Sequence, residues 1–180
     1  MDLAEFKNSF IQLRNRAEAA KEHIQSEEAT KTSIIMPFFR NLGYDVFNPQ
    51  EFLPEFTADV GLKKGEKVDY AIMENGNPVI LIEAKPYDIS LEQHESQLIR
   101  YFTQTTAKFA ILTNGVLYRF FTDLEDPNKM DERPFFEFNL LKFSDSDLAE
   151  LKKFKKESFN VSLVIDTAEE LKYKNLIKDL

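Results

Sequence analysis

The fold of this chain is decided by the stretch Pro78-Val79-Ile80-Leu81-Ile82-Glu83-Ala84-Lys85. Its continuous apolar run is typical of a β-strand that is buried on both faces. A carboxylate and an ammonium group follow two residues apart, and the alternation of a strand places Glu83 and Lys85 on one face with Leu81. Taken alone, this ending has a simpler explanation, which is a solvated strand end with a chance ion pair.

The neighbouring stretches predict a sheet around this strand. Asn75-Gly76 comes directly before it and is a strong signal for a tight hairpin turn, and Asn114-Gly115 predicts a second turn further along the chain. A polar stretch at 123–134 indicates a loop. We expect strands at residues 57–62, 67–73, 78–83, 109–113, 116–121 and 135–140.

Helices are expected before, between and after these strands. Apolar residues recur at gaps of three and four from Leu3 to Ile24, with Asp2 as the N-cap. Pro37 predicts a kink or break in a second helix, and Gly43 is suited to end it. The expected helices are 3–24, 27–42, 90–104 (capped by Ser90), 145–154 and 167–177. This order predicts an α/β fold, with a mixed central sheet flanked by helices.

The composition limits the kinds of function. The absence of cysteine excludes disulfides and thiolate metal sites, and two histidines argue against a multi-histidine zinc centre. No apolar run is long enough to span a membrane, and we expect a protein of the reducing cytoplasm. The net charge of −8 argues against a broad nucleic-acid-coating surface. A carboxylate metal site is itself acidic, however, and local basic patches can still contact phosphates.

A second acidic residue is predicted to meet the end of the central strand. Asp69 lies on the preceding strand, and the hairpin through Asn75-Gly76 folds it back toward Glu83. Two carboxylates at one sheet edge repel each other, and a divalent cation is their natural neutraliser. The alternative is that Asp69 is an exposed strand residue.

A third element is the helix that follows the central strand. Gln97 and Tyr101 are four residues apart and therefore share a helix face, and Gln93 extends that face one turn back. The alternative is a helix surface with a partly buried tyrosine. His94 lies close by, but nothing in the sequence pairs with it, and we interpret it as a surface histidine.

Together, the three elements resemble the PD-(D/E)xK nuclease superfamily in its Q-x-x-x-Y branch. Within this branch the chain is similar to the N-terminal nuclease domain of type I restriction enzyme R subunits. Further segments that carry the resemblance are Glu27-Glu28-Ala29-Thr30, Ile35-Met36-Pro37-Phe38, Leu42-Gly43-Tyr44, Lys67-Val68-Asp69-Tyr70 and Leu112-Thr113-Asn114-Gly115. The resemblance covers residues 1–140 and implies a restriction-endonuclease-like core. We expect residues 141–180 to be a C-terminal extension that packs on the same domain and leads into a missing region.

The resemblance implies a Mg²⁺-dependent DNA endonuclease, with Mn²⁺ as a substitute. Asp69 and Glu83 would coordinate the metal, with the backbone carbonyl of Ala84 as a further ligand. Lys85 would position or activate the attacking water and stabilise charge on the phosphate. Hard oxygen ligands favour these cations over zinc.

The resemblance also implies residues around this centre. Gln97 and Tyr101 would hold the DNA backbone. A helix glutamate would complete the site; the spacing to Thr30 in the family's pattern selects Glu27, with Glu28 as the runner-up. Helical phase agrees with Glu27, which shares a face with apolar residues at 24, 34 and 38.

Two other interpretations concern a glycine-containing turn and the loss of catalysis. Residues 61–68 superficially look like a phosphate loop, but the glycines are too close and no Ser or Thr follows the lysine, so a hairpin turn is expected. The chain could also be a non-catalytic nucleic-acid- or protein-binding module that retains the nuclease fold. No ATPase motif is present, so a translocating ATPase partner would belong to a missing region or to another restriction subunit. We expect the chain to bind DNA and not to associate with a membrane.

Overall fold

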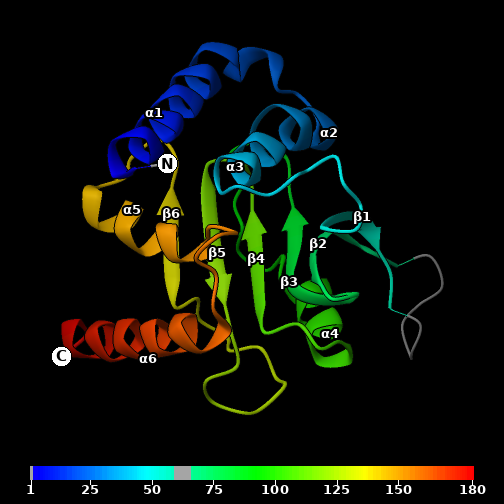
Figure 1. The fold of residues 1–180 in the computed structure, drawn as a ribbon, viewed down its shortest axis with the longest axis vertical. Helices are drawn as coiled ribbons and strands as arrows, with labels where there is room; N and C mark the ends of the chain where they lie inside the picture. Colours follow the sequence, from blue (N-terminus) through cyan, green and yellow to red (C-terminus); the bar gives the residue numbers. More distant parts are fainter. Residues whose placement is uncertain (1, 59–65) are drawn as a thin grey trace.

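The protein is described by a computed structural model that covers residues 2–58 and 66–180. In these residues, six strands form one sheet in the order β1-β2-β3-β4-β5-β6 (Figure 1). The strands are β1 (Phe52–Phe56), β2 (Val68–Glu74), β3 (Asn77–Ala84), β4 (Phe109–Thr113), β5 (Leu117–Phe121) and β6 (Phe136–Asn139). β3 and β4 run parallel, whereas the other neighbours are antiparallel. The sheet is therefore mixed, as predicted.

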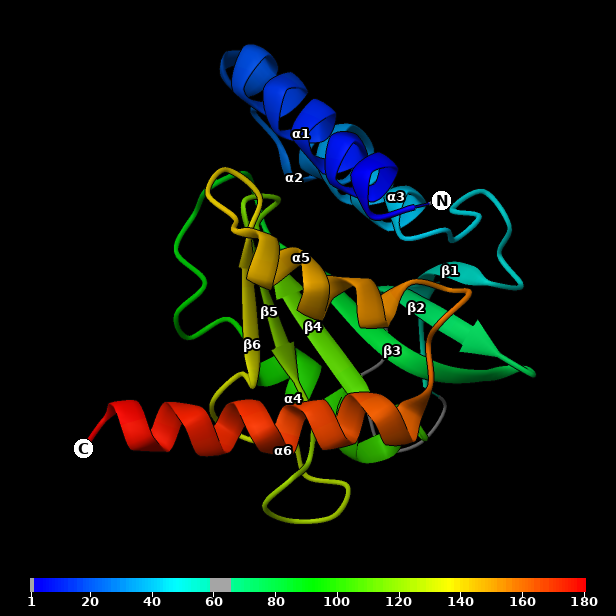
Figure 2. The same ribbon diagram turned by 60° about the vertical axis from the view of Figure 1, so that its left-hand side comes forward.

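Helices cover both faces of this sheet, which confirms the predicted α/β class. The helical elements are α1 (Leu3–Ala20), η1 (Lys21–His23), α2 (Glu27–Thr30), η2 (Lys31–Ile35), α3 (Met36–Asn41), α4 (Ser96–Gln104), α5 (Asp145–Leu151), η3 (Lys152–Phe154) and α6 (Val161–Lys178). Figure 2 shows α5 and α6 in front of the sheet and α4 behind it.

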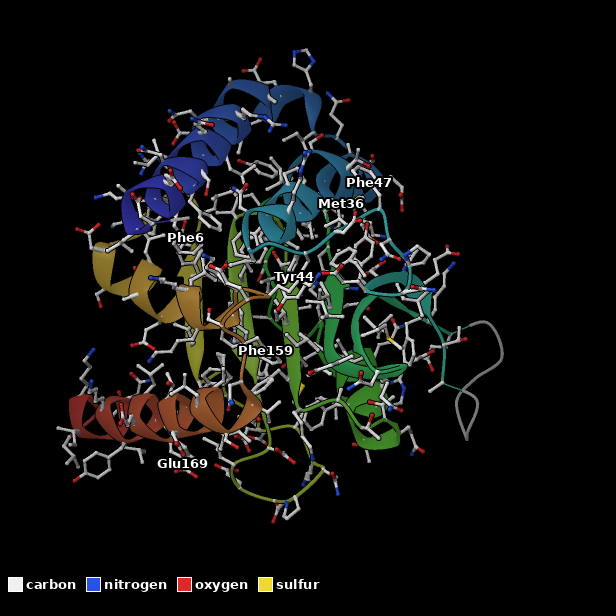
Figure 3. All side chains as sticks on the ribbon, in the orientation of Figure 1. Phe6, Met36, Tyr44, Phe47, Phe159 and Glu169 are labelled. Carbon is white, nitrogen blue, oxygen red and sulfur yellow. The ribbon has the colours of Figure 1, made fainter. Side chains whose placement is uncertain are left out.

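Two apolar clusters fill the two spaces between sheet and helices. The alternation of β3 separates them, since Ile80 and Ile82 belong to the larger cluster and Leu81 belongs to the smaller one. The larger cluster contains Phe6 of α1, and Phe159 before α6 packs against it; both are labelled in Figure 3. The smaller cluster is closed by α4. A strand with apolar residues on both faces is what such a three-layer arrangement requires.

Residues after 140 contribute to the larger cluster as well. Leu148 and Leu151 of α5 and Val164 of α6 are buried in it. The division of the chain at residue 140 remains a prediction. In the described part of the chain, none of the helices is both long enough and apolar enough to cross a membrane.

The N-terminal helices follow the sequence pattern closely. The Asp2 side chain accepts a hydrogen bond from the backbone N–H of Glu5 at 2.8 Å, which confirms the predicted N-cap. The second helix runs without a gap from α2 to α3, but its middle, η2, is a π-helix in which the N–H of Met36 donates to the carbonyl of Lys31. Pro37 follows this wider segment, and Gly43 ends the helix with a φ of +95°.

Both predicted turns are confirmed. Asn75 and Gly76 have φ values of +52° and +80° between β2 and β3, the positive pair that a type I′ hairpin needs. Gly115, between β4 and β5, has a φ of +84°. The strand after each turn starts within two residues of it.

The prediction for the first strand was wrong. The strand expected at 57–62 is instead β1, five residues earlier, and Thr57 and Ala58 are outside any strand; residues 59–62 lie outside the described part. β1 contains Pro54. β1 is an edge strand, where a proline without an N–H is tolerated. Residues 61–65 of the stretch that looks like a phosphate loop also lie outside the described residues.

Two helix starts were also wrong. The helix expected from Ser90 begins at Ser96, because the backbone at Gln93 has a φ of +63° and the Ser90 hydroxyl accepts from the N–H of Glu92 in a local turn. Gln93 therefore does not extend the face of α4. The last helix begins at Val161 and not at residue 167, since the Asn160 side chain caps it at 3.1 Å.

Gly115 packs directly against α2. A Cβ at this position would lie 2.9 Å from the Cγ2 atom of Thr30. We predict that Gly115→Ala lowers the free energy of unfolding by roughly 2–4 kcal/mol, because positive φ and overpacking each have a cost. The matched control is Gly76→Ala, where φ is +80° and nothing lies within 4 Å, so only the backbone cost of about 1 kcal/mol should remain. Urea unfolding measures both, and equal losses would contradict the close packing.

Candidate active site

The β2–β3 hairpin brings Asp69 and Glu83 to the same end of the sheet. Tyr70 pairs with Ile82 in the hairpin register, so Asp69 lies beside the end of β3. Its Oδ2 atom accepts a hydrogen bond from the N–H of Ala84 at 2.8 Å. This bond links the Asp69 side chain to the main chain next to Glu83, and both side chains are largely buried, with exposed fractions of 14 % and 7 %.

Glu83 is a buried carboxylate in unfavourable surroundings. Its Oε2 atom is buried and has no hydrogen-bond partner among the described residues. Burial and the negative charge of Asp69 raise the pKa of Glu83 well above its ordinary value, and the positive charge of Lys85 only partly opposes this. A buried acceptor without a donor is costly unless something else satisfies it. Binding of a cation or a proton would therefore stabilise this carboxylate.

Lys85 lies just beyond β3 and is aligned by the sheet. Its backbone N–H donates to the carbonyl of Thr113 at 2.8 Å, which continues the parallel pairing with β4. Its Nζ atom is 3.6 Å from Oε1 of Glu83. The side chain keeps 23 % of its surface exposed, so the ammonium group lies at the border between the carboxylate and solvent.

Lys31 is a site residue that the sequence analysis missed. Its Nζ atom is 2.5 Å from Oδ1 of Asp69, 3.1 Å from Oε1 of Glu28 and 3.6 Å from Oε1 of Glu27. Burial opposes the charge of Lys31, but the hydrogen bonds and charges of Asp69 and Glu28 prevail and raise its pKa above the ordinary lysine value. The spacing of four from Glu27 was the available signal, since it puts both residues on one helix face.

Of the two helix glutamates, Glu27 is oriented toward the site. Its side chain is 38 % exposed, against 82 % for Glu28, and its negative charge contributes to the raised pKa of Glu83. Figure 1 shows α2, which carries both, above the upper ends of β3 and β4. The geometry favours Glu27 over Glu28, and its catalytic role remains a prediction.

The helix residues Gln97 and Tyr101 are bonded to the chain itself. The Gln97 amide donates to the carbonyl of Lys67, and the Tyr101 hydroxyl donates to the carbonyl of Glu66. Tyr101 has no exposed surface, while Gln97 is partly exposed. Both side chains thus fix the segment that leads into β2, and so the approach to Asp69. Their contact with DNA remains a prediction.

The donor set at this edge fits a hard divalent cation. Asp69, Glu83 and the main-chain carbonyl of Ala84 offer oxygen atoms, and the partnerless Oε2 of Glu83 is an acceptor that a cation would satisfy. Within residues 2–58 and 66–180, however, no three side chains of the types His, Cys, Asp or Glu are arranged to hold a metal ion. Glu27 would be the third carboxylate of the set. The Lys31 ammonium lies near it and contacts Asp69 directly.

The protein is an α/β domain consistent with a restriction-endonuclease-like core. This class is defined by a mixed sheet flanked by helices, with two carboxylates and a lysine at one edge of the sheet. Residues 55–129 of this domain match the family described as Type I restriction enzyme R protein N terminus. This match confirms the resemblance predicted from the sequence. Comparison with curated proteins and with solved structures gives no match.

The matched segment contains most of the predicted site, but not all of it. It runs from the end of β1 to the loop after β5 and includes Asp69, Glu83 and Lys85. It is less than half of the chain, and Glu27 and Lys31 lie outside it. The family match therefore relates this domain to type I restriction enzymes and does not extend to the helix that carries Glu27 and Lys31.

Proposed function

We propose that this domain is a metal-dependent DNA endonuclease and the nuclease part of a type I restriction-like system. The observation that carries the proposal is the buried Glu83 carboxylate, whose Oε2 has no partner in the described residues, beside Asp69 and 3.6 Å from Lys85. Structural carboxylates in such burial are normally paired or hydrogen-bonded. A site that keeps one incompletely satisfied next to a second carboxylate is typical of a functional centre.

Asp69, Glu83 and the carbonyl of Ala84 would hold Mg²⁺ or Mn²⁺. When bound, such an ion supplies charge neutralisation at phosphorus and a more acidic water molecule. Lys85 would then hold the attacking water by a hydrogen bond and place positive charge where the phosphate becomes more negative. Its position at the border of the buried pair lets the ammonium group reach a phosphate from the solvent side.

DNA would approach along the side where α4 meets the start of β2. Gln97 is partly exposed there, and Tyr101 fixes the main chain beneath it. The net charge of −8 disfavours unspecific binding to DNA, so the isolated domain is expected to be a weak nuclease. We propose that a translocating ATPase, in another region or chain of a cytoplasmic restriction system, delivers the DNA.

A second candidate function is a non-catalytic binding module that retains the fold. The contact of Lys31 with Asp69 favours it, since this ion pair neutralises one of the two predicted ligands without any metal.

One assay separates the two candidates. Supercoiled plasmid is incubated with the domain and Mg²⁺ or Mn²⁺, with and without EDTA, and nicked product is quantified. We expect slow nicking that EDTA abolishes and that the Glu83→Gln variant lacks. Nicking that persists in EDTA would contradict metal dependence, and nicking at the parental rate in Glu83→Gln would overturn the site assignment. No nicking at any protein concentration, with DNA binding intact, would support the binding module.

A further inference from the structure

The Lys31 ammonium lies among three carboxylates at the centre of the candidate site. It contacts Asp69 at 2.5 Å, while Glu28 and Glu27 follow at 3.1 and 3.6 Å. Its side chain is only 13 % exposed. A lysine that was merely part of a solvated helix surface would keep its ammonium in water. This one is directed inward, onto the oxygen atom that the proposed metal would need.

Gly115 holds the helix around Lys31 in place, while Glu28 offers the Lys31 ammonium a second partner besides Asp69. Thr30, the residue before Lys31, packs so closely on Gly115 that a Cβ there would come within 2.9 Å. Lys31 is also the first residue of the π-helix η2, a distortion that is frequent at functional sites. The lysine stem is flexible, and Glu28 is an exposed acceptor already within reach.

We propose that Lys31 is a built-in counter-ion of the metal site. Lys31 neutralises Asp69 and Glu27 while no metal is bound, and it leaves Asp69 for Glu28 when a divalent cation enters. The inference rests on the proposed function and deepens it, because it makes Lys31 the residue that sets how much metal the site requires. Lys31 acts through Asp69 and is therefore a positioning residue.

The charge argument predicts opposite effects on two properties. Removing the ammonium takes a competing cation from Asp69, so a divalent cation should bind more tightly. An adjacent opposite charge typically changes the cation affinity of a carboxylate by about tenfold or more, judged from proton binding. In the absence of metal, the same change leaves Asp69 and Glu27 without the ammonium that neutralises them. The metal-free protein should therefore melt at a lower temperature.

The test is Mn²⁺ titration by calorimetry, together with thermal unfolding in EDTA and in Mn²⁺. It uses the parent, Lys31→Met and Lys31→Arg, with Lys153→Met as the control. Lys153 is also partly buried and pairs with a glutamate three residues away, but it lies on η3, where its other contact is Thr167 of α6. We expect about tenfold tighter Mn²⁺ binding and a lower metal-free melting temperature for Lys31→Met. Lys31→Arg should bind Mn²⁺ no more tightly than the parent, and Lys153→Met should bind it equally.

Failure of the inference can be distinguished from failure of the proposed function. If the parent binds Mn²⁺ and Lys31→Met binds it equally or more weakly, the counter-ion role is overturned while the metal site stands. If the parent does not bind Mn²⁺ at all, the proposed metal-dependent function and the inference both fail. Should Lys31→Met not fold by circular dichroism, Lys31→Gln takes its place, since the amide removes the charge but can still donate to Asp69. The same tighter binding is expected of it, and its absence overturns the proposal.

Discussion

Glu83→Gln should eliminate Mn²⁺ binding and DNA cleavage and at the same time stabilise the metal-free protein. The amide has the shape of the carboxylate but cannot serve as an anionic ligand, so we expect activity to fall by at least about 10²–10³. The fold should remain, because the amide fits the same buried position at the end of β3. The measurements are plasmid nicking, Mn²⁺ calorimetry and thermal unfolding in EDTA.

The stabilisation should depend on pH in a defined direction. Burial and Asp69 raise the pKa of Glu83 in the folded state, so the folded protein holds a proton that the unfolded chain releases above the ordinary glutamate pKa. In the metal-free protein, stability is thus present at low pH and is lost as the pH rises toward the raised value. Glu83→Gln removes this loss, so the variant should be more stable than the parent by a margin that is larger at pH 8 than at pH 5. At pH 8 we expect the free energy of unfolding to rise by about 1 kcal/mol or more.

The control is Glu74→Gln, at the exposed end of β2 next to the hairpin turn. It makes the same chemical change on a solvated carboxylate and should alter neither activity nor stability. A Glu83→Gln protein that cuts DNA at the parental rate would overturn the site assignment. A variant that unfolds at a clearly lower temperature in EDTA would instead indicate a structural role for the Glu83 carboxylate.

Lys85→Ala should reduce cleavage by about 10²–10³ while metal binding survives. The ammonium lies 3.6 Å from Glu83 and is no metal ligand, so its loss removes only the charge offered to water and phosphate. Mn²⁺ affinity should stay the same or rise slightly, because a nearby positive charge opposes the ion. Lys85→Arg should not restore the rate, since a planar guanidinium cannot give up a proton and has a different geometry.

Lys108→Ala provides the comparison for this second change. Lys108 is an exposed lysine just before β4, and its loss should leave cleavage nearly unchanged. Full activity of Lys85→Ala would contradict the catalytic role. Loss of both activity and Mn²⁺ binding would mean that the site had collapsed, and this would contradict the separation of roles between Lys85 and the carboxylates.

Local signals predicted the centre of the molecule well. The apolar run of β3, the Asn75-Gly76 turn and the position of Asp69 are encoded within about twenty consecutive residues, and a type I′ hairpin allows little freedom in register. The pairing of Asp69 with the end of β3 therefore followed from sequence alone. The N-cap at Asp2 and the glycine at 43 were predictable for the same reason, since each depends on a few neighbouring residues.

The errors have local and distant causes. α6 begins early because of its local cap at Asn160, whereas β1 and the loop before α4 also depend on contacts with distant parts of the chain. β1 contains Pro54 and can still be a strand because it lies at the edge of the sheet, where it pairs only with β2. The start of α4 moved from Ser90 to Ser96, and Asn114 donates from its side chain to the carbonyl of Ile89 in the intervening loop. No pattern within residues 85–95 records that contact.

The sequence by itself determined the strand, the turn and the three residues Asp69, Glu83 and Lys85, because hairpin geometry brings them together through short-range rules. Only the tertiary structure decided that Lys31 lies beside Asp69 at the candidate site. Its partner Asp69 is 38 positions away, on another element, and the two meet because Gly115 lets the helix lie against the sheet. Whether a helix lysine faces solvent or a buried carboxylate depends on where the helix packs, and packing is a property of the whole chain.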